Sequence, residues 1–241
     1  SMQEILLIDK PKGITSFDCI RILRKELGIR KIGHAGTLDP MATGLMIIGV
    51  GEGTKNLGQY LKLPKTYEAE ILLGIHTDTG DTTGRELPIS NDQFPNNDLI
   101  SEISKEEIKK TLQSMVGKLE LPVPAYSAIK QGGEALYKKA RRGEVVDTPI
   151  KTMEITAVEF LGLKILPLKK GGDPEGEGFP PLLSKEGIEG WLVSTRFSVS
   201  SGTYIRSLAE EFGRRLGIPA TLAGLRRTRI GNFCIEDAEA I

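Results

Sequence analysis

The sequence is poor in the residues that mark metal centres, disulfide frameworks and serine-type triads. It has two cysteines, Cys19 and Cys234, which lie at opposite ends without CxxC spacing, and it has two histidines. Distant cysteines argue against a disulfide framework and a zinc site, and two histidines are too few to argue for a catalytic triad. We therefore expect no metal site and reduced, structural cysteines.

Long apolar runs are also lacking. No stretch approaches the roughly 20 residues that span a bilayer, and the first residues lack the basic and apolar blocks of a signal peptide. A hydrophobic fraction of 39% and a charged fraction of 27% are typical of a folded globular protein. We expect a cytoplasmic protein without membrane contact and, because no heptad pattern is present, a monomer.

The chain has no excess of either charge, since 32 basic residues balance 32 acidic ones. A neutral total does not by itself suggest a nucleic-acid partner. The charges are nevertheless uneven: residues 124–151 carry six bases and three acids, and residues 204–230 carry six arginines and two glutamates. Such tracts are usually solvated surfaces, and phosphate contact is the better interpretation only if both lie beside a functional site.

The apolar pattern predicts strands interleaved irregularly with helices. Capping-box spacing, Thr15 with Asp18 and Ser104 with Glu107, marks two helix starts. The lack of regular βαβ alternation favours an α+β fold around a mixed, largely antiparallel sheet, formed as a single domain over 1–241. The predicted strands are 4–9, 45–50, 66–75, 153–163 and 191–201, and the predicted helices are 17–27, 104–117, 134–142 and 203–217.

Two segments interrupt this pattern. The basic segment at 124–151 follows a proline-rich stretch and contains Gly132 and Gly133, so we expect an excursion made of a loop and a short helix. The segment at 169–190 is rich in glycine and proline and lacks periodicity, which indicates an insertion or mobile linker and not a domain boundary.

One carboxylate stands in an unusual turn. Residues 36–44 read GTLDPMATG, so Asp39 lies among glycine, proline and threonine between two apolar runs. The backbone is expected to present Asp39 at a tight corner. This fragment alone leaves two interpretations open, an ordinary Asx turn and a catalytic reagent.

Two glycine-rich stretches resemble ligand loops but lack the required residues. The stretch 49–55 does not have the Gly-Lys-Ser/Thr order of a Walker loop. The stretch 78–84 has Gly80 at a ligand position of a calcium loop and no glutamate at the twelfth place.

An arginine near the start of a predicted helix also needs an explanation. Arg206 opposes the helix macrodipole there, so we expect a carboxylate partner, either Asp39 or Asp81. Tyr204, close to Arg206 in sequence, and Tyr67, on a predicted strand, could be functional residues. Each could instead serve only to pack against the core.

Six motifs in fixed order extend over nearly the whole chain: LIDKPKGITS at 7–16, KIGHAGTLDPMATG at 31–44, KTY at 65–67, TDTGD at 77–81, SGTYIRSL at 201–208 and LRRT at 225–228. This series resembles the motifs of the bacterial tRNA pseudouridine synthases of the TruB type. The resemblance implies the pseudouridine synthase fold and isomerisation of uridine to pseudouridine at position 55 in the T loop of tRNA. It also implies that no cofactor is needed, because the reaction is redox-neutral.

The resemblance further implies roles for individual residues. Asp39 matches the catalytic aspartate, Tyr67 the tyrosine that stacks on the flipped uracil, and Arg206 the arginine that pairs with the aspartate. The other expected substrate-binding residues are Tyr204 and Leu225 in the pocket, Asp81 in the ion network of Asp39 and Arg206, and His34 entering the T loop. Contacts to the RNA are expected from Lys12, Lys130, Lys138, Arg141 and the arginines after Leu225.

The chain departs from the family pattern in two respects. Family members usually carry a C-terminal PUA domain, whereas this chain ends at Ile241, so we expect no PUA domain. The segment 169–190 has no recognised family counterpart.

Alternative functions remain open. One is a pseudouridine synthase acting on another RNA stem-loop, and another is a non-catalytic RNA-binding or RNA-folding module, which would be expected to have lost Asp39 or Arg206. A hydrolase is disfavoured because no second carboxylate or metal set is apparent. The sequence leaves open whether Asp39 attacks C1′, adds to C6 or removes a sugar proton.

Overall fold

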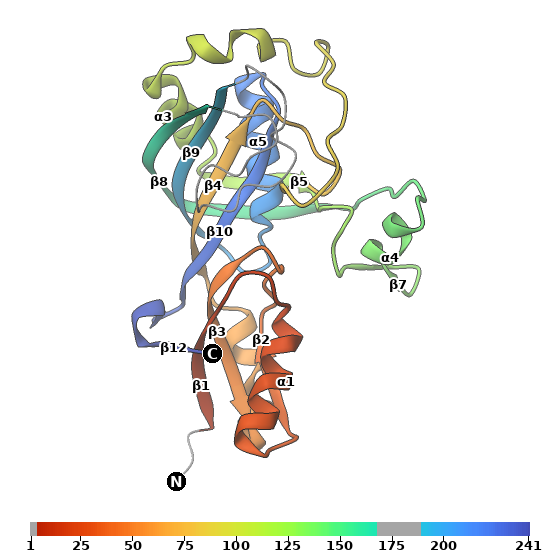
Figure 1. The fold of residues 1–241 in the computed structure, drawn as a ribbon, viewed down its shortest axis with the longest axis vertical. Helices are drawn as coiled ribbons and strands as arrows, with labels where there is room; N and C mark the ends of the chain where they lie inside the picture. The colour runs from red at the N-terminus through yellow and green to blue at the C-terminus, as the bar shows by residue number, and fades with distance from the viewer. Residues whose placement is uncertain (1–3, 168–188) are drawn as a thin grey trace. The chain divides into compact units, whose positions relative to one another are not determined.

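The computed structural model describes residues 4–167 and 189–241, which form two compact units (Figure 1). Unit 1 contains the chain up to Glu68 together with Arg196–Gly202 and Gly224–Ile241, and unit 2 contains Ala69–Thr195 and Thr203–Ala223. Three strands contribute residues to both units: β4 (Lys65–Leu73), β9 (Glu189–Val199) and β10 (Ala220–Ile230). The predicted insertion at 169–190 lies outside the described residues, apart from its last two residues, which begin β9.

A buried central strand organises unit 1. Every residue of β3 from Gly44 to Val50 is buried, and β3 has a paired strand on each side. It pairs antiparallel with β1 and β2 and parallel with β10, while β12 pairs parallel with β1 and β11 antiparallel with β10. The bounds are β1 (Ile5–Lys10), β2 (Ile32–Ala35), β3 (Thr43–Val50), β11 (Phe233–Cys234) and β12 (Glu239–Ala240).

Helix α1 (Ser16–Leu27) is the long helix of unit 1 and begins and ends where local chemistry predicts. The Thr15 side chain accepts from the Asp18 amide, the Asp18 carboxylate accepts from the Thr15 amide, and Gly28 ends the helix in the left-handed conformation. The helix buries Cys19 and Ile20. The short helical segments of this unit are η1 (Gly51–Asn56), α2 (Gly58–Leu61) and η4 (Ile235–Asp237).

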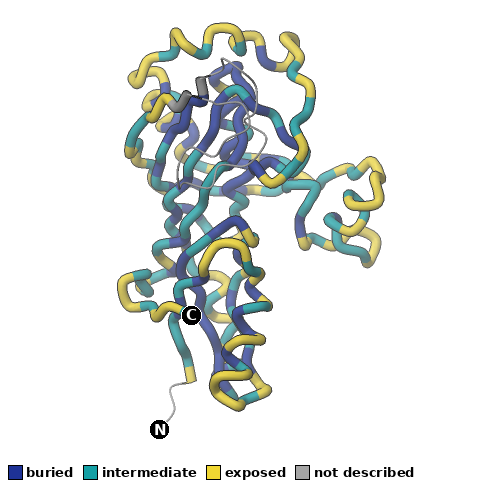
Figure 2. The backbone as a smooth tube through the Cα atoms, in the orientation of Figure 1, coloured by how far each residue is buried: buried dark blue, intermediate teal, exposed yellow. Residues whose placement is uncertain are grey.

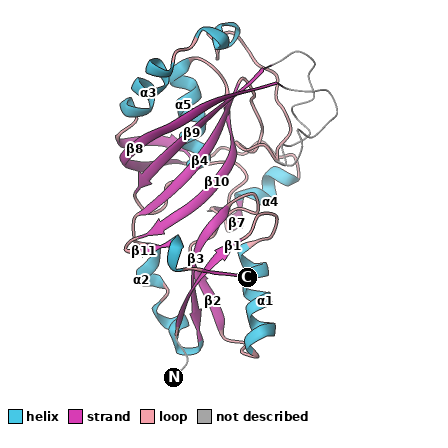
Figure 3. Cartoon of the chain, turned by 60° about the vertical axis from the view of Figure 1, so that its left-hand side comes forward, coloured by secondary structure: helices cyan, strands magenta, loops and turns pink. Residues whose placement is uncertain are grey.

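In unit 2 the strand order is β10-β4-β9-β8-β5, with helices packed against the sheet (Figure 3). Helix α3 contacts β8 and α5, and α5 also contacts β5. Both helices bury one apolar stripe, which includes Ile108 and Leu112 on α3 and Leu208 and Phe212 on α5. The bounds are β5 (Gly117–Pro122), β8 (Ile150–Pro167), α3 (Lys105–Ser114), α5 (Ile205–Leu216) and η2 (Asn97–Glu102).

The basic excursion forms a small hairpin and a helix within unit 2. Strands β6 (Lys130–Gln131) and β7 (Glu134–Ala135) pair across the two glycines, and α4 (Leu136–Arg141) follows. Figure 2 shows this segment as mostly exposed and half-buried backbone, in contrast to the buried strands of the unit. The short helix predicted at 134–142 is found as α4, whereas the predicted loop contains the hairpin of β6 and β7.

The α+β class and the mixed, largely antiparallel sheet are confirmed, and the single-domain organisation of 1–241 stays a prediction. Strands β2, β5 and β10 were not predicted: β2 has only four residues, β5 was assigned in part to the preceding helix, which ends at Ser114, and no strand was assigned after α5. Strands β10 and β5 are defined by pairing with segments far along the chain, β3 and β8, whereas β2 pairs with the next strand, β3. No helix among the described residues is long and apolar enough to cross a membrane.

The glycine at the start of β3 gives a first testable prediction. A β-carbon on Gly44 would lie 2.3 Å from the Arg227 carbonyl oxygen, and its φ is +113°. At Gly28 φ is +67°, and no described atom lies within 4 Å of the same position. We expect Gly28→Ala to lower the free energy of unfolding by about 1 kcal/mol and Gly44→Ala to lower it by several times more, measured by urea denaturation. Equal losses would show that the β10 backbone does not restrict the side chain at position 44.

Candidate active site

The Asp39 turn connects β2 to β3 in unit 1. The Ala42 amide donates to the Asp39 carbonyl at 2.9 Å, which closes the turn, and Asp39 is half-buried. The hydroxyl of Ser16, at the start of α1, accepts from the Leu38 amide at 2.9 Å and lies 3.2 Å from the Leu38 carbonyl. The backbone next to Asp39 is thus held by a helix terminus, so the turn is more than an isolated Asx turn.

A buried lysine holds the other side of the turn. Lys10 is 0% exposed, and its ammonium donates to the carbonyls of Pro11 (2.8 Å), Ile14 (2.7 Å) and Pro40 (3.4 Å). Burial lowers the pKa of Lys10, and the nearby Cys19 and Asp39 oppose that shift. The sequence motif that contains Lys10 therefore serves to hold the Asp39 turn.

The exposed parts of unit 1 include one expected RNA-binding residue, Lys12, which lies in the turn after β1. His34 is half-buried on β2, opposite Ile48 of β3. Burial lowers the pKa of His34, the Arg227 guanidinium lowers it further, and a hydrogen bond to the Gly36 backbone opposes the shift. Among the described residues, no hydrogen-bond partner lies near the buried His34 Nδ1.

Tyr67 lies on β4 and is 8% exposed. The carbonyl of the preceding Thr66 accepts from the Thr228 hydroxyl of β10 at 3.3 Å. Leu225 lies on the same strand β10 and is half-buried. Tyr67 and Leu225 thus come from the two strands that this hydrogen bond joins.

The two arginines after Leu225 differ in their surroundings. Arg226 makes a bidentate ion pair with Asp9, at 3.0 and 2.9 Å, and also donates to Thr43. Arg227 is buried and donates to the carbonyls of Gly36 and Leu45. The expectation that the arginines after Leu225 contact RNA is therefore wrong for Arg227, because its guanidinium is used inside the protein.

Arg206 lies in unit 2 at the first turn of α5 and is buried. Its guanidinium donates to the Thr79 carbonyl and to the Tyr126 carbonyl, each at 3.0 Å. Tyr204 is the N-cap residue of α5, and the Lys151 ammonium lies 5.6 Å from the centre of its ring. Arg206 thereby joins the loop after β4 to the base of the basic excursion.

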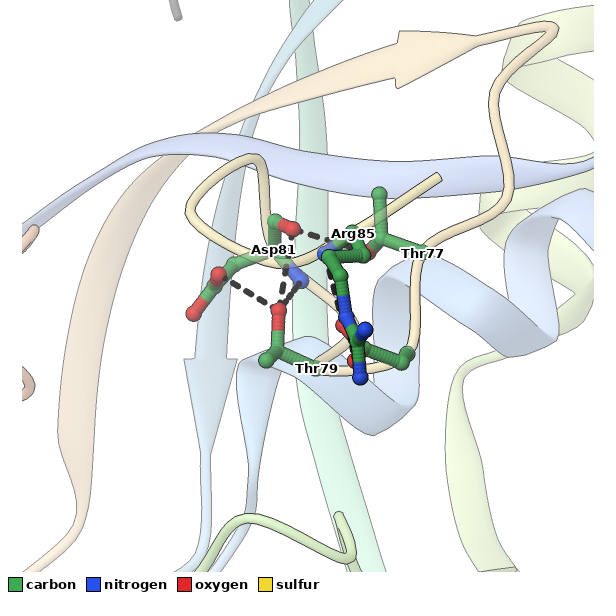
Figure 4. A network of polar contacts seen from close by, with 5 residues as sticks. Thr77, Thr79, Asp81 and Arg85 are labelled. Carbon is green, nitrogen blue, oxygen red and sulfur yellow. Dashed lines mark hydrogen bonds and ion pairs between the residues drawn. The ribbon is translucent and has the colours of Figure 1, made fainter. Parts of the chain in front are cut away.

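The loop after β4 contains Asp81 (Figure 4). The Asp81 carboxylate accepts from the hydroxyl of Thr79 (2.8 Å) and from the amide (3.0 Å) and hydroxyl (2.5 Å) of Thr83. Thr77 donates its hydroxyl to the Asp81 carbonyl at 2.8 Å, and the Asp81 backbone pairs with Leu222 of β10. The carboxylate organises its own loop, and its expected place in an ion network with Arg206 stays a prediction.

A half-buried carboxylate on α5 was not predicted from the sequence. Glu210 lies one helical turn after Arg206, and its Oε1 would be 2.7 Å from a β-carbon on Gly80. Burial raises the pKa of Glu210, and the nearby Arg214 and Arg206 oppose the shift. The spacing of four residues on a helix was the available sequence signal.

Lys130 and Arg141 lie on the basic excursion of unit 2, and both are exposed. The Arg141 guanidinium lies over the Tyr137 ring, 5.1 Å from its centre. Lys138 and Arg142 are also exposed on this short segment, although Arg142 is paired with Glu134. The excursion therefore presents cations to solvent.

Among residues 4–167 and 189–241, no group of three or more His, Cys, Asp or Glu side chains could hold a metal.

The expected site residues come from both units. Asp39, Tyr67, Leu225, His34 and Lys12 belong to unit 1, and Arg206, Tyr204, Asp81, Lys130 and Arg141 belong to unit 2. The pairing of Asp39 with Arg206 stays a prediction.

The fold is shared with Cbf5. The chain matches the solved archaeal box H/ACA sRNP Nop10-Cbf5 complex with a TM-score of 0.60 and a Cbf5-Nop10-Gar1 complex with a TM-score of 0.63. These matches cover 98% of this chain and 50% and 52% of those chains, at 23% and 24% sequence identity. They define the class of fold, the mixed sheet with flanking helices.

The particular family follows from sequence. Residues 24–168 match the family model described as TruB family pseudouridylate synthase (N terminal domain). The tRNA pseudouridine synthase B of Xanthomonas oryzae pv. oryzae is 39% identical over 229 residues, 95% of this chain and 64% of that protein. The protein of that name from Bacillus cereus is 38% identical over 239 residues, 98% of this chain and 68% of that protein. This chain belongs to the TruB family.

A lysine beside Tyr67 gives a prediction about pH. Burial lowers the pKa of Lys65 to about 8, and repulsion from Arg227 acts in the same direction. Because the unfolded chain has the ordinary lysine pKa of 10.5, it binds more protons than the folded chain between pH 8 and 10.5. Relative to Lys65→Met, the wild-type free energy of unfolding should therefore rise across this window, by about 3 kcal/mol in total.

Urea denaturation from pH 7 to 10.5 measures this difference. Lys62→Met changes an exposed lysine of the same unit and should show no such rise. Parallel curves for wild type and Lys65→Met would mean that the ammonium is not desolvated.

Proposed function

We propose that this chain isomerises uridine to pseudouridine at position 55 in the T loop of tRNA. Family membership supports the reaction class, and one structural observation carries the assignment of the reagent. Asp39, which the motif resemblance assigns as the catalytic aspartate, is half-buried in a turn whose backbone is bonded to Ser16 and Lys10. A carboxylate held in this way is positioned for chemistry, as a reagent must be.

The proposed reaction breaks the bond between N1 and C1′ and joins C1′ to C5 of the same uracil. One proton leaves C5 and one is gained at N1, so neither an oxidant nor a reductant is required. In this proposal Asp39 is the reagent, and the Arg206 guanidinium pairs with it and holds its geometry. Attack at C1′, addition at C6 and removal of a sugar proton are all compatible with that role.

The target base must leave the loop stack to reach Asp39, at a cost of a few kcal/mol. In the proposal the Tyr67 ring stacks on the flipped uracil, and Tyr204 and Leu225 line the pocket. Unpaired loop bases are the usual targets of sequence-specific RNA recognition.

Contacts to the RNA backbone are proposed for the exposed cations Lys12, Lys130 and Arg141, and His34 is proposed to enter the T loop. The neutral total charge of the chain does not oppose this, because the excursion concentrates positive charge locally. The chain spans about two-thirds of the length of the curated relatives that it matches, so its substrate is part of the proposal. We also propose that the protein is a monomer and is located in the cytoplasm.

Removing the charge of Asp39 tests the proposed reagent. We expect Asp39→Asn to bind unmodified tRNA as tightly as wild type and to form no pseudouridine, because the amide keeps the shape of the side chain without its charge. Binding is measured by filter retention, and product by chemical mapping of pseudouridine after single turnover. Asp92→Asn, which changes an exposed carboxylate, serves as the matched control and should keep full activity. Turnover by Asp39→Asn would reject the assignment.

The excursion is tested by salt dependence. We expect Lys130→Ala and Arg141→Ala each to weaken tRNA binding and to reduce the slope of log affinity against log salt by about one, since each removes one phosphate contact. The single-turnover rate at saturating tRNA should be unchanged. Lys110→Ala, an exposed lysine on α3 of the same unit, should leave the slope as in wild type. An unchanged slope for both excursion variants would show that the excursion does not bind phosphate.

A further inference from the structure

Arg227 is a fully buried large side chain that has no part in the proposed chemistry. It is 1% exposed, and its Nε donates to the Leu45 carbonyl at 2.8 Å while its Nη2 donates to the Gly36 carbonyl at 3.1 Å. These two carbonyls stand at the two ends of the segment that contains Asp39. One planar guanidinium therefore connects the end of β2 to the start of β3.

One glycine allows the arginine backbone to come this close. A β-carbon on Gly44 would lie 2.3 Å from the Arg227 carbonyl oxygen, whereas one on Gly36 would lie 3.4 Å from Arg227 Nη1, an ordinary van der Waals distance. Arg227 is also paired with Gly44 in the parallel ladder of β10 and β3. Backbone and side chain of a single residue thus contact both ends of the Asp39 turn.

Packing alone does not account for a charged group here. Within residues 4–167 and 189–241 no carboxylate forms an ion pair with Arg227, and its hydrogen-bond acceptors are carbonyl groups. Burying a cation without a counter-charge is costly, and an apolar residue of similar volume is often as stable or more stable. The charge repels neighbouring cations as well, since it lowers the pKa of both Lys65 and His34.

We propose that Arg227 is a positioning residue for Asp39. It acts through the carbonyls of Gly36 and Leu45, fixes the distance between the two ends of the turn, and does not touch the RNA. The consequence for the reaction rests on the proposed function of Asp39, whereas the effect on the turn does not. The position of a reacting group matters steeply, since a displacement of about 1 Å can reduce a rate by roughly 100-fold.

Two substitutions test this role. Arg227→Met keeps the volume and removes both hydrogen bonds, and Arg227→Lys keeps the charge and can reach only one carbonyl. At saturating tRNA we expect the single-turnover rate to fall about 100-fold in Arg227→Met and less in Arg227→Lys. The dissociation constant for tRNA should stay within about twofold of wild type, because the side chain is buried. Arg21→Met, at an exposed position on α1, is the control for the same chemical change and should behave as wild type.

A second readout does not depend on catalysis. Amide hydrogen exchange in residues 36–45 should be faster in Arg227→Lys than in wild type, while exchange in α5 and β8 should be unchanged. Unchanged exchange in residues 36–45 would overturn the proposal, as would tRNA affinity that falls while the saturated rate is kept. If wild type forms no pseudouridine, the proposed function fails, and exchange alone still decides the role of Arg227. Arg227→Lys also serves for both readouts if Arg227→Met does not fold.

Discussion

The position of Asp39 depends on hydrogen bonds that buried cations donate to carbonyl groups around its turn. Among the described residues, the backbone between β2 and β3 has no strand partner, and buried backbone groups must be paired. Lys10 bonds to the Pro40 carbonyl, and Arg227 bonds to the carbonyls of Gly36 and Leu45. Hydrogen bonds from charged donors are stronger than those from neutral donors, so these contacts restrain a segment that has no strand partner.

The two buried cations, Lys10 and Arg227, lie on the strands that flank β3 in unit 1. Lys10 lies at the end of β1, which pairs with β3, and Arg227 lies on β10, which pairs with β3 on its other side. Each of these two neighbours of β3 therefore contributes one cation to the turn before that strand. The buried core of unit 1 and the position of Asp39 therefore depend on the same three paired strands, β1, β3 and β10.

Much of the fold could be predicted from local sequence, because local rules determine helix ends. The capping boxes at Thr15 and Ser104 and the apolar stripe of α5 predicted their helices closely. Strands β5 and β10 were missed because pairing with a distant partner, and not composition, defines them, and β2 was missed because it has only four residues. The same contrast between local and distant determinants applies to the candidate site. The glycine, proline and threonine around Asp39 marked it as a turn carboxylate, whereas the cations that hold the turn lie on other strands.

Arg227 shows why residue type alone is a poor guide to role. An arginine in a basic tract was expected to contact phosphate, yet its position on β10 directs it into the core. Burial and hydrogen-bond partners decide such a case, and both are properties of tertiary structure. The Asp81 carboxylate is bonded to hydroxyl and amide groups of its own loop, and its expected place in an ion network stays a prediction.

The proposed activity of this chain is the isomerisation of one uridine in the T loop of tRNA. Its most direct test is to incubate the wild-type protein with unmodified tRNA, and separately with a tRNA in which the T-loop uridine is replaced by cytidine, and to map pseudouridine in both. We expect pseudouridine at the T-loop position of the first tRNA and none in the second. Pseudouridine at other positions in both tRNAs would contradict this proposal. The absence of pseudouridine from both tRNAs would also contradict it.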